Sequence, residues 1–204
     1  MKIRRMYFMF TTVVIGVLII GGCATTGKIS GPTGTDSTLL IGRVSLSCSE
    51  FPQTWGCNGN HTNGIVIDLR HVQTKEITSI RSKGADGLFF MHDPEEGLYE
   101  FIKLSFKKGG SNYTTNLFYV PDRRTYFPVV RNAVNNMGDI HWQSVYQAKI
   151  EETESRKGTS ILGSVEDSCR YENNFDELKA WFSAEYPESE WNRRDWVPTN
   201  IKTQ

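Results

Sequence analysis

The sequence has no excess charge of either sign and lacks the short motifs of the common catalytic and nucleotide-binding sites. It holds 23 Lys and Arg against 23 Asp and Glu, a balance that argues against nucleic acid as a partner because nucleic acid selects basic surfaces. It has no Gly-x-Ser-x-Gly elbow, His-Glu-x-x-His pair, phosphate loop or dinucleotide fingerprint. Its histidines fall on separate predicted elements, at His61, His71, His92 and His141. We therefore predict a protein that is not an enzyme and has no cofactor.

No apolar run is as long as a typical membrane-spanning helix, which needs about 20 residues. The longest run covers residues 6–20, follows a short basic stretch at residues 2–5, and ends in Gly21-Gly22-Cys23. This order of basic, apolar and small residues is typical of a secretory signal peptide. An uncleaved membrane anchor is the alternative interpretation. Removal of the signal would leave 20 basic against 23 acidic residues.

The residues Ile20-Gly21-Gly22-Cys23 resemble the lipobox of bacterial lipoproteins. The resemblance implies that residues 1–22 are cut off, that the Cys23 thiol carries diacylglycerol, and that the new amino group is acylated. Two or three acyl chains are enough for stable membrane anchoring. The partner implied for Cys23 is therefore membrane lipid in the bacterial cell envelope. Ala24 rather than Asp after the cysteine favours the outer over the inner membrane, by analogy with the sorting rule of Gram-negative lipoproteins.

Three further cysteines would enter an oxidising compartment, where disulfides form and persist. Cys48 and Cys57 flank one short polar loop, so a bridge between them is the leading interpretation, and closing so small a loop stabilises by roughly 2.5 kcal/mol. Cys169 would then be left over, although it could instead pair with either of the others. A metal site near Cys57 and His61 is disfavoured because zinc needs four ligands at tight spacing. We predict no metal.

The chain after Cys23 divides into a tether, a strand-rich domain and a different last part. Residues 23–38 contain almost no apolar residue, and we expect a flexible tether there. Residues 39–150 alternate apolar and polar positions between glycine-rich turns, which predicts a mostly β fold, an antiparallel β-sandwich or barrel. The expected strands are Leu39–Ser47, Gly64–His71, Glu76–Arg81, Gly87–His92, Leu98–Phe106, Tyr113–Val120, Thr125–Val130 and Asp139–Ile150.

A second resemblance lies in the strand-rich part. Gly42-Arg43-Val44 opens its first strand, Asp86-Gly87-Leu88-Phe89 begins another, and Gly97-Leu98-Tyr99 leads into the next. These residues resemble the carboxypeptidase-regulatory-like, or transthyretin-like, β-sandwich family, over about Leu39 to His141. Glu96 replaces the proline of the family signature, and Met91 replaces its second aromatic residue. The resemblance implies a rigid scaffold or adhesion module without catalytic residues in the fold.

The last part, residues 151–204, begins with a charged stretch, 151–158, that we read as a loop or strand end. Phe175, Leu178 and Phe182 then recur at helical spacing, which predicts an amphipathic helix over Phe175–Glu185 with Asn173 or Asn174 as its cap. We expect this helix to pack on the sandwich. Behind it lie the aromatic and basic residues Trp191, Arg193, Arg194 and Trp196, which could close the sandwich or stack on a ligand.

Two functions remain from this reading. The first is a non-catalytic envelope lipoprotein, structural or adhesive, that presents its loops to an envelope or host-surface protein. The second is a ligand-binding lipoprotein that uses Trp191, Arg193, Arg194 and Trp196 to hold a glycan or peptide. Buried indoles at Trp191 and Trp196 would favour the first function. A Ser-His-carboxylate cluster in one cleft would revive an enzymatic function.

Overall fold

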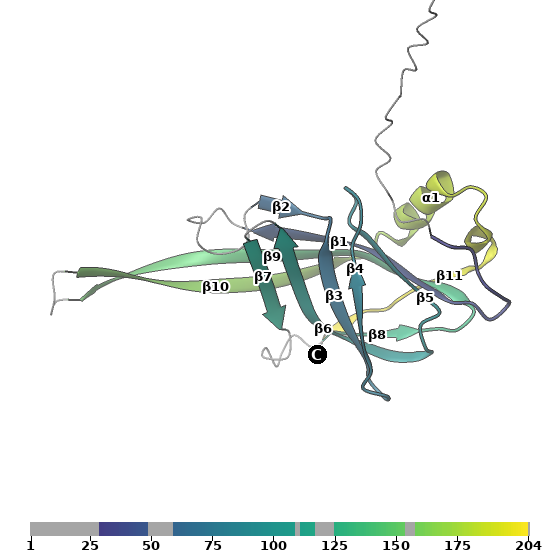
Figure 1. Ribbon diagram of the computed structural model, residues 1–204, viewed down its shortest axis with the longest axis horizontal. Helices are drawn as coiled ribbons and strands as arrows, with labels where there is room; N and C mark the ends of the chain where they lie inside the picture. Colours follow the sequence, from purple (N-terminus) through teal and green to yellow (C-terminus); the bar gives the residue numbers. More distant parts are fainter. Residues whose placement is uncertain (1–28, 49–58, 109–110, 117–124, 154–157, 204) are drawn as a thin grey trace, which may run out of the picture.

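The chain folds into two β-sheets with one α-helix near its C-terminus, as a computed structural model describes for residues 29–48, 59–108, 111–116, 125–153 and 158–203 (Figure 1). The predicted mostly β, sandwich-like fold with a C-terminal helix is confirmed. The elements are β1 (Leu39–Cys48), β2 (Gly59–His61), β3 (Ile65–His71), β4 (Ile77–Arg81), β5 (Leu88–His92), β6 (Gly97–Lys108), β7 (Ser111–Asn116), β8 (Thr125–Val129), β9 (Ala133–Thr153), β10 (Gly158–Glu172), α1 (Phe175–Glu185), the short 3-10 helix η3 (Glu190–Arg193), β11 (Asp195–Pro198) and β12 (Lys202–Thr203).

The first sheet, called sheet A, has the order β10-β9-β1-β2, with β5 also beside β1 and β11 beside β9. The second, sheet B, has the order β12-β8-β6-β3-β4, with β7 also beside β6. Most neighbours are antiparallel, as predicted. However, β9 runs parallel to both β1 and β11. A parallel pair needs a long crossover, and here strands β2 to β8, which include all of sheet B except β12, lie between β1 and β9 in the chain.

The core between the two sheets is built by strand alternation. On β1 the side chains of Leu40, Val44 and Leu46 point into it and are almost fully buried. Sheet B contributes buried residues such as Phe101, whose ring meets that of Trp142 on β9 edge to face, with centroids 6.3 Å apart. The opposite face of β1 carries a second apolar cluster at one end, with Leu39 and Ile41, and the polar residues Arg43 and Ser45 further along.

The predicted helix over Phe175–Glu185 is confirmed, and α1 packs on the outer face of sheet A. Leu178 and Phe182 are fully buried there against Leu39 and Ile41 of β1, whereas Phe175 is only half-buried. Asn174 precedes the helix as expected, but its side chain makes no capping hydrogen bond. Among the described residues, no helix has the length and apolar character required to cross a membrane.

The fold begins earlier than the sequence suggests. Residues 29–37 were expected to belong to the tether, yet Ile29 is buried in the cluster under α1 and the Ser37 hydroxyl accepts hydrogen bonds from the backbone N–H groups of Thr33 and Gly34. The indole of Trp191 also donates to the Ser30 carbonyl at 2.7 Å. This polar segment is held by one buried apolar side chain and by hydrogen bonds of its backbone. Its composition therefore gives no sign that it is part of the folded domain.

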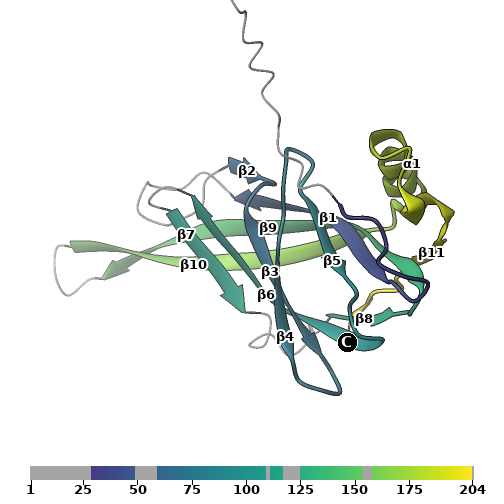
Figure 2. The same ribbon diagram turned by 45° about the vertical axis from the view of Figure 1, so that its right-hand side comes forward.

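The longest departure from prediction is the hairpin of β9 and β10. The sequence predicts a strand over 139–150 and a loop or strand end over 151–158, but β9 has 21 residues and β10, which was not predicted, has 15. The last register pair between β1 and β9 is Cys48 with Ser144, whereas β9 and β10 continue together to Thr153 and Gly158. The hairpin projects beyond both sheets as a two-stranded arm, residues 145–153 and 158–167 (Figures 1 and 2).

Candidate functional site

The outer face of sheet A carries a row of polar side chains beside α1. Register aligns Arg43, Asp139 and Glu172 across β1, β9 and β10, and aligns Ser45, His141 and Arg170 one step further along. We call these six residues the polar face. Asp139 comes directly after a register shift in β9, where Gly138 has φ +66 and a Cβ would lie only 2.4 Å from the Glu172 carbonyl oxygen. Glycine is required there, and it brings β9 and β10 close together.

Arg43 and Asp139 form the centre of this face. The guanidinium donates through Nε and Nη2 to both carboxylate oxygens of Asp139, at 2.6 and 2.9 Å, and Nη2 also reaches Glu177 of α1 at 3.1 Å. Burial disfavours the charged form of Arg43, but the hydrogen bonds and attraction to Asp139 and Glu177 outweigh it, so the pKa of Arg43 is raised. The two parallel hydrogen bonds to Asp139 fix the orientation of the guanidinium. Its contact with Glu177 then holds the first turn of α1 against the sheet.

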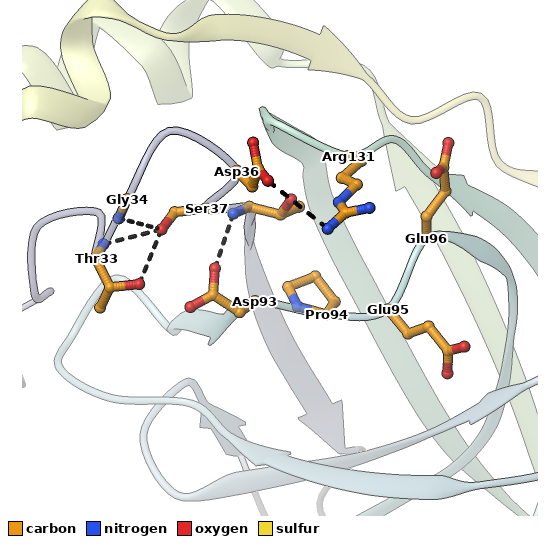
Figure 3. A pocket seen from close by; sticks show the side chains of 10 residues that line it. Thr33, Gly34, Asp36, Ser37, Asp93, Pro94, Glu95, Glu96 and Arg131 are labelled. Atoms are coloured by element: carbon orange, nitrogen blue, oxygen red, sulfur yellow. Dashed lines mark hydrogen bonds and ion pairs between the residues drawn. The ribbon is translucent and has the colours of Figure 1, made fainter.

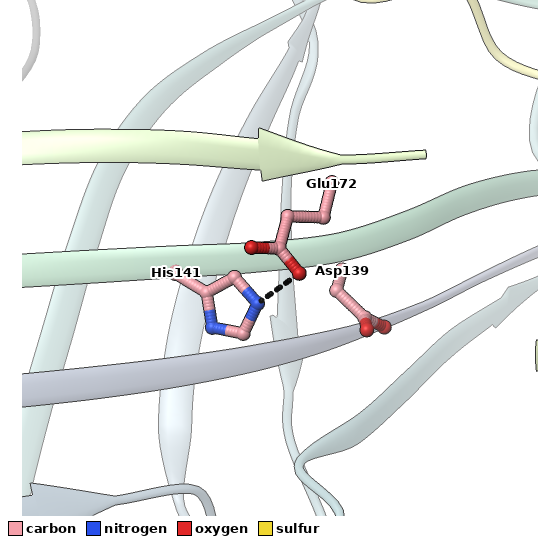
Figure 4. A group of neighbouring side chains, drawn as sticks. All are labelled: Asp139, His141 and Glu172. Atoms are coloured by element: carbon pink, nitrogen blue, oxygen red, sulfur yellow. Dashed lines mark ion pairs between the residues drawn. The ribbon is translucent and has the colours of Figure 1, made fainter. Parts of the chain in front are cut away.

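His141 links the second row to the first (Figure 4). Its Nδ1 lies 2.8 Å from the Ser45 hydroxyl, and its Nε2 lies 3.4 Å from Glu172 Oε2. The second contact is close enough for an ion pair, although it does not have hydrogen-bond geometry. The Asn174 amide donates to both Asp139 and Glu172, and Arg170 pairs with Glu172 at 2.8 Å.

Asp139, His141 and Glu172 place three possible metal-ligand atoms within 4.8 Å of one another. The surrounding contacts do not favour a cation. Both Asp139 oxygens already accept hydrogen bonds from Arg43, and the guanidinium would repel a metal ion at this position. The positive charges of Arg43 and Arg170 already offset the nearby carboxylates. We therefore interpret the cluster as an ion network and not as a metal centre.

The series Ser45, His141, Glu172 has the residue types of a nucleophile, base and acid, so it bears on the enzymatic alternative. A hydrolase also needs hydrogen-bond donors aimed at the oxyanion of the tetrahedral intermediate. Ser45 lies mid-strand, and β1, β9 and β10 pair continuously through these positions, so their backbone N–H groups serve the sheet. In the described part of the chain, the neighbouring Val44 N–H also bonds, to the Gly87 carbonyl at 2.9 Å. Among the described residues, these paired N–H groups do not form an oxyanion hole beside Ser45.

A hollow of about 660 Å³ lies apart from the polar face, between residues 33–38 and the turn at 93–96 (Figure 3). The sequence suggests an acidic turn at Asp93, Glu95 and Glu96 that falls short of a calcium site. Asp93 accepts a hydrogen bond from the Thr38 N–H at 2.9 Å. In Figure 3 the carboxylates of Glu95 and Glu96 point in different directions, so they do not converge on one point where a cation could bind.

The aromatic residues proposed for ligand binding are mostly occupied by the fold itself. Trp191 is fully buried and Trp196 is half-buried, with its indole N–H donating to the Trp191 carbonyl at 3.2 Å. Arg194 donates to the carbonyls of Thr35 and Gly34 at 2.5 and 2.6 Å, while Arg193 is exposed. These residues hold residues 29–37 against the C-terminal segment.

Cysteine positions are described in part. Cys48 is disulfide-bonded, and its predicted partner Cys57 lies outside the described residues, as does the predicted lipidation site Cys23. Cys169 keeps its thiol and is half-buried beside the core. Comparisons with protein-family models, curated proteins and solved structures found no match for this chain.

Proposed function

We propose that this chain is a bacterial lipoprotein, anchored in the cell envelope through acylated Cys23, and that its folded part is a non-catalytic interaction module. The signal-like residues 1–22 and the lipobox-like residues before Cys23 support the anchor. Ala24 supports the outer membrane as its location. The partner is another protein of the envelope or of a host surface.

The observation that carries the interaction role is the arm of β9 and β10. It extends past the last pairing of β1 with β9, and among the described strands each of its strands pairs only with the other. A two-stranded hairpin is marginally stable by itself in water. An exposed strand edge also presents a row of N–H and C=O groups that another chain can pair with. The arm therefore contributes little to the stability of the domain, and its exposed strand edges are suited to contact with a partner.

The ligand-binding alternative has less support. It needs indole faces open to solvent, whereas Trp191 is fully buried and Arg194 is engaged with backbone carbonyls. The polar face is also largely engaged in its own ion pairs and hydrogen bonds. The contacts of Trp191 and Arg194 hold the C-terminal segment in place, and the contacts of the polar face hold the base of the hairpin of β9 and β10.

The experiment is a pull-down of cross-linked partners from envelopes that carry either the full lipidated chain or a variant with a shorter arm. Deleting residues 147–152 and 159–164 removes paired positions from both strands and keeps the register of those that remain. We expect partner recovery to fall at least tenfold with the short arm, by analogy with the loss of a main contact surface. The Lys179→Ala variant, altered on the exposed side of α1, is the matched control. Equal recovery from all three proteins would contradict the proposal.

A further inference from the structure

Strand β4 (Ile77–Arg81) forms one edge of sheet B, and of the described strands β3 alone pairs with it (Figure 1). Proteins normally protect a strand edge with proline, a bulge, inward-pointing charges or a covering segment. Strand β4 contains no proline, its register with β3 is continuous, and its one charged side chain, Arg81, is exposed. Ile77, Thr78 and Ile80 are β-branched, a type that favours strands. The edge is therefore suited to pairing with a further strand.

The hairpin of β3 and β4 determines which backbone groups this edge offers. The His71 N–H donates to the Glu76 carbonyl at 2.9 Å, and the Ser82 N–H donates to the Ile65 carbonyl at 2.7 Å. Hydrogen-bonded positions alternate along an antiparallel strand, so positions 78 and 80 also bond toward β3. The N–H and C=O groups of positions 77, 79 and 81 therefore point away from β3, and no other described strand pairs with them.

The side chains of β4 suit a second copy of the same strand. Ile77 is 55% exposed, more than any other large apolar side chain in the described part of the chain. Ile77, Ser79 and Arg81 share the outer face of sheet B, because Ile80 between them is buried in the core between the sheets. In an antiparallel pair centred on Ser79, each Ile77 lies opposite the other copy's Arg81. The two arginines are then kept at opposite ends, and the aliphatic part of each can cover an isoleucine.

We propose that β4 pairs antiparallel with β4 of a second copy of this chain, about a two-fold axis at Ser79. This register opposes position 77 with position 81 and position 79 with itself, so the outward-pointing backbone groups of both strands meet. The pairing ends where the chain turns away: Lys75 has φ +66, and the Lys83 ammonium lies over the Phe90 ring, 5.1 Å from its centroid. The interface is isologous and closed, so it stops at a dimer. This contact goes beyond the proposed function because it does not involve the arm.

Charge substitutions at position 77 test the pairing and its register. The full chain, purified in detergent, is compared by analytical ultracentrifugation with Ile77→Lys, which puts like charges opposite each other twice, and with Ile77→Glu, which puts opposite charges there. We expect a dimeric parent and a dissociation constant at least about tenfold higher for Ile77→Lys, but less than about threefold higher for Ile77→Glu. The Ile77→Lys, Arg81→Glu double variant should recover the dimer. Arg70 lies opposite Ile77 within one copy and acts on monomer and dimer alike.

The matched control is Val130→Lys, which makes a similar change at the other exposed large apolar side chain, directly after β8. This variant should stay dimeric. Disulfide cross-linking in intact envelopes checks the register independently. Ser79→Cys should give a linked dimer on mild oxidation because position 79 meets itself on the axis, whereas Arg81→Cys should give no more than the parent chain because position 81 lies opposite position 77.

The outcomes also separate this inference from the proposed function. A monomeric parent, or a dimer that Ile77→Lys does not weaken, would overturn the pairing through β4. Equal weakening by Ile77→Lys and Ile77→Glu, without recovery in the double variant, would overturn the register. The chain with the short arm should still dimerise, and loss of its dimer would place the contact on the arm. A dimer through β4 without any arm-dependent partner would support this inference and contradict the proposed function.

Discussion

Phe182 should be the residue on which docking of α1 depends most. Its side chain is fully buried between α1 and sheet A, with Leu39, Ile41 and Val134 in the same cluster, and its ring lies 5.3 Å from that of Trp196. Truncating a buried phenylalanine to alanine costs about 3 to 5 kcal/mol. In a domain of this size each kcal/mol lowers the melting temperature by about 2 to 4 °C. Phe182→Ala should therefore lower it by roughly 6 to 20 °C.

The assay is thermal unfolding of the chain without its signal, followed by circular dichroism. Lys179→Ala is the control because Lys179 lies on the exposed side of the same helix, and surface changes typically stay within about 0.5 kcal/mol. Equal and negligible shifts for both variants would refute the reasoning. They would show that α1 and the segment behind it contribute little to the stability of the sheets.

Three further predictions concern the disulfide, the polar face and pH. Non-reducing peptide mapping should find Cys48 and Cys57 in one linked fragment, and a map that links Cys48 elsewhere would reject the local bridge. Arg43→Met should lower the free energy of unfolding by about 2 to 3 kcal/mol, because it leaves the mostly buried Asp139 carboxylate without the guanidinium that pairs with it. Denaturant unfolding should show that stability recovers in the Arg43→Met, Asp139→Leu double variant. Burial lowers the pKa of His92, although the charge of Asp93 acts in the opposite direction. The unfolded chain therefore takes up the proton at a higher pH than the folded chain, and stability should decrease as pH falls below about 6.5. His92→Gln should flatten this pH dependence of stability, and an unchanged slope would contradict the prediction.

Most strands of residues 39–130 could be predicted because their apolar alternation is strong and glycine turns separate them. The short strand β2 was not predicted, and residues 117–120 of the predicted strand Tyr113–Val120 lie outside the described residues. Predicted Leu39–Ser47 and Gly87–His92 differ from β1 and β5 by one residue at one end. Helix α1 has the predicted bounds, since Leu178 and Phe182 mark its buried face. The parallel pairing of β1 with β9 was not predictable, because it depends on contacts far apart in the chain.

The polar face could be predicted only in part for the same reason. His141 was visible in the sequence, but Arg170 and Glu172 lie on β10, a strand that the sequence did not predict. Glycine, serine and acidic residues in β10 resemble a loop by composition. Only the pairing with β9 brings Glu172 beside His141 and Asp139. Residues 29–37 were missed because backbone carbonyls, which carry no sequence signal, make their main contacts.

The most direct test of the central proposal is site-specific photo-cross-linking in intact envelopes. A photoreactive amino acid replaces Leu162 in the arm or Lys179 on α1 of the lipidated chain, and a fatty-acid label on the parent, absent from Cys23→Ala, verifies the anchor. An interaction module that works through its arm predicts a protein adduct from position 162 and little or none from position 179. Adducts from position 179 alone, or from neither position, would contradict it.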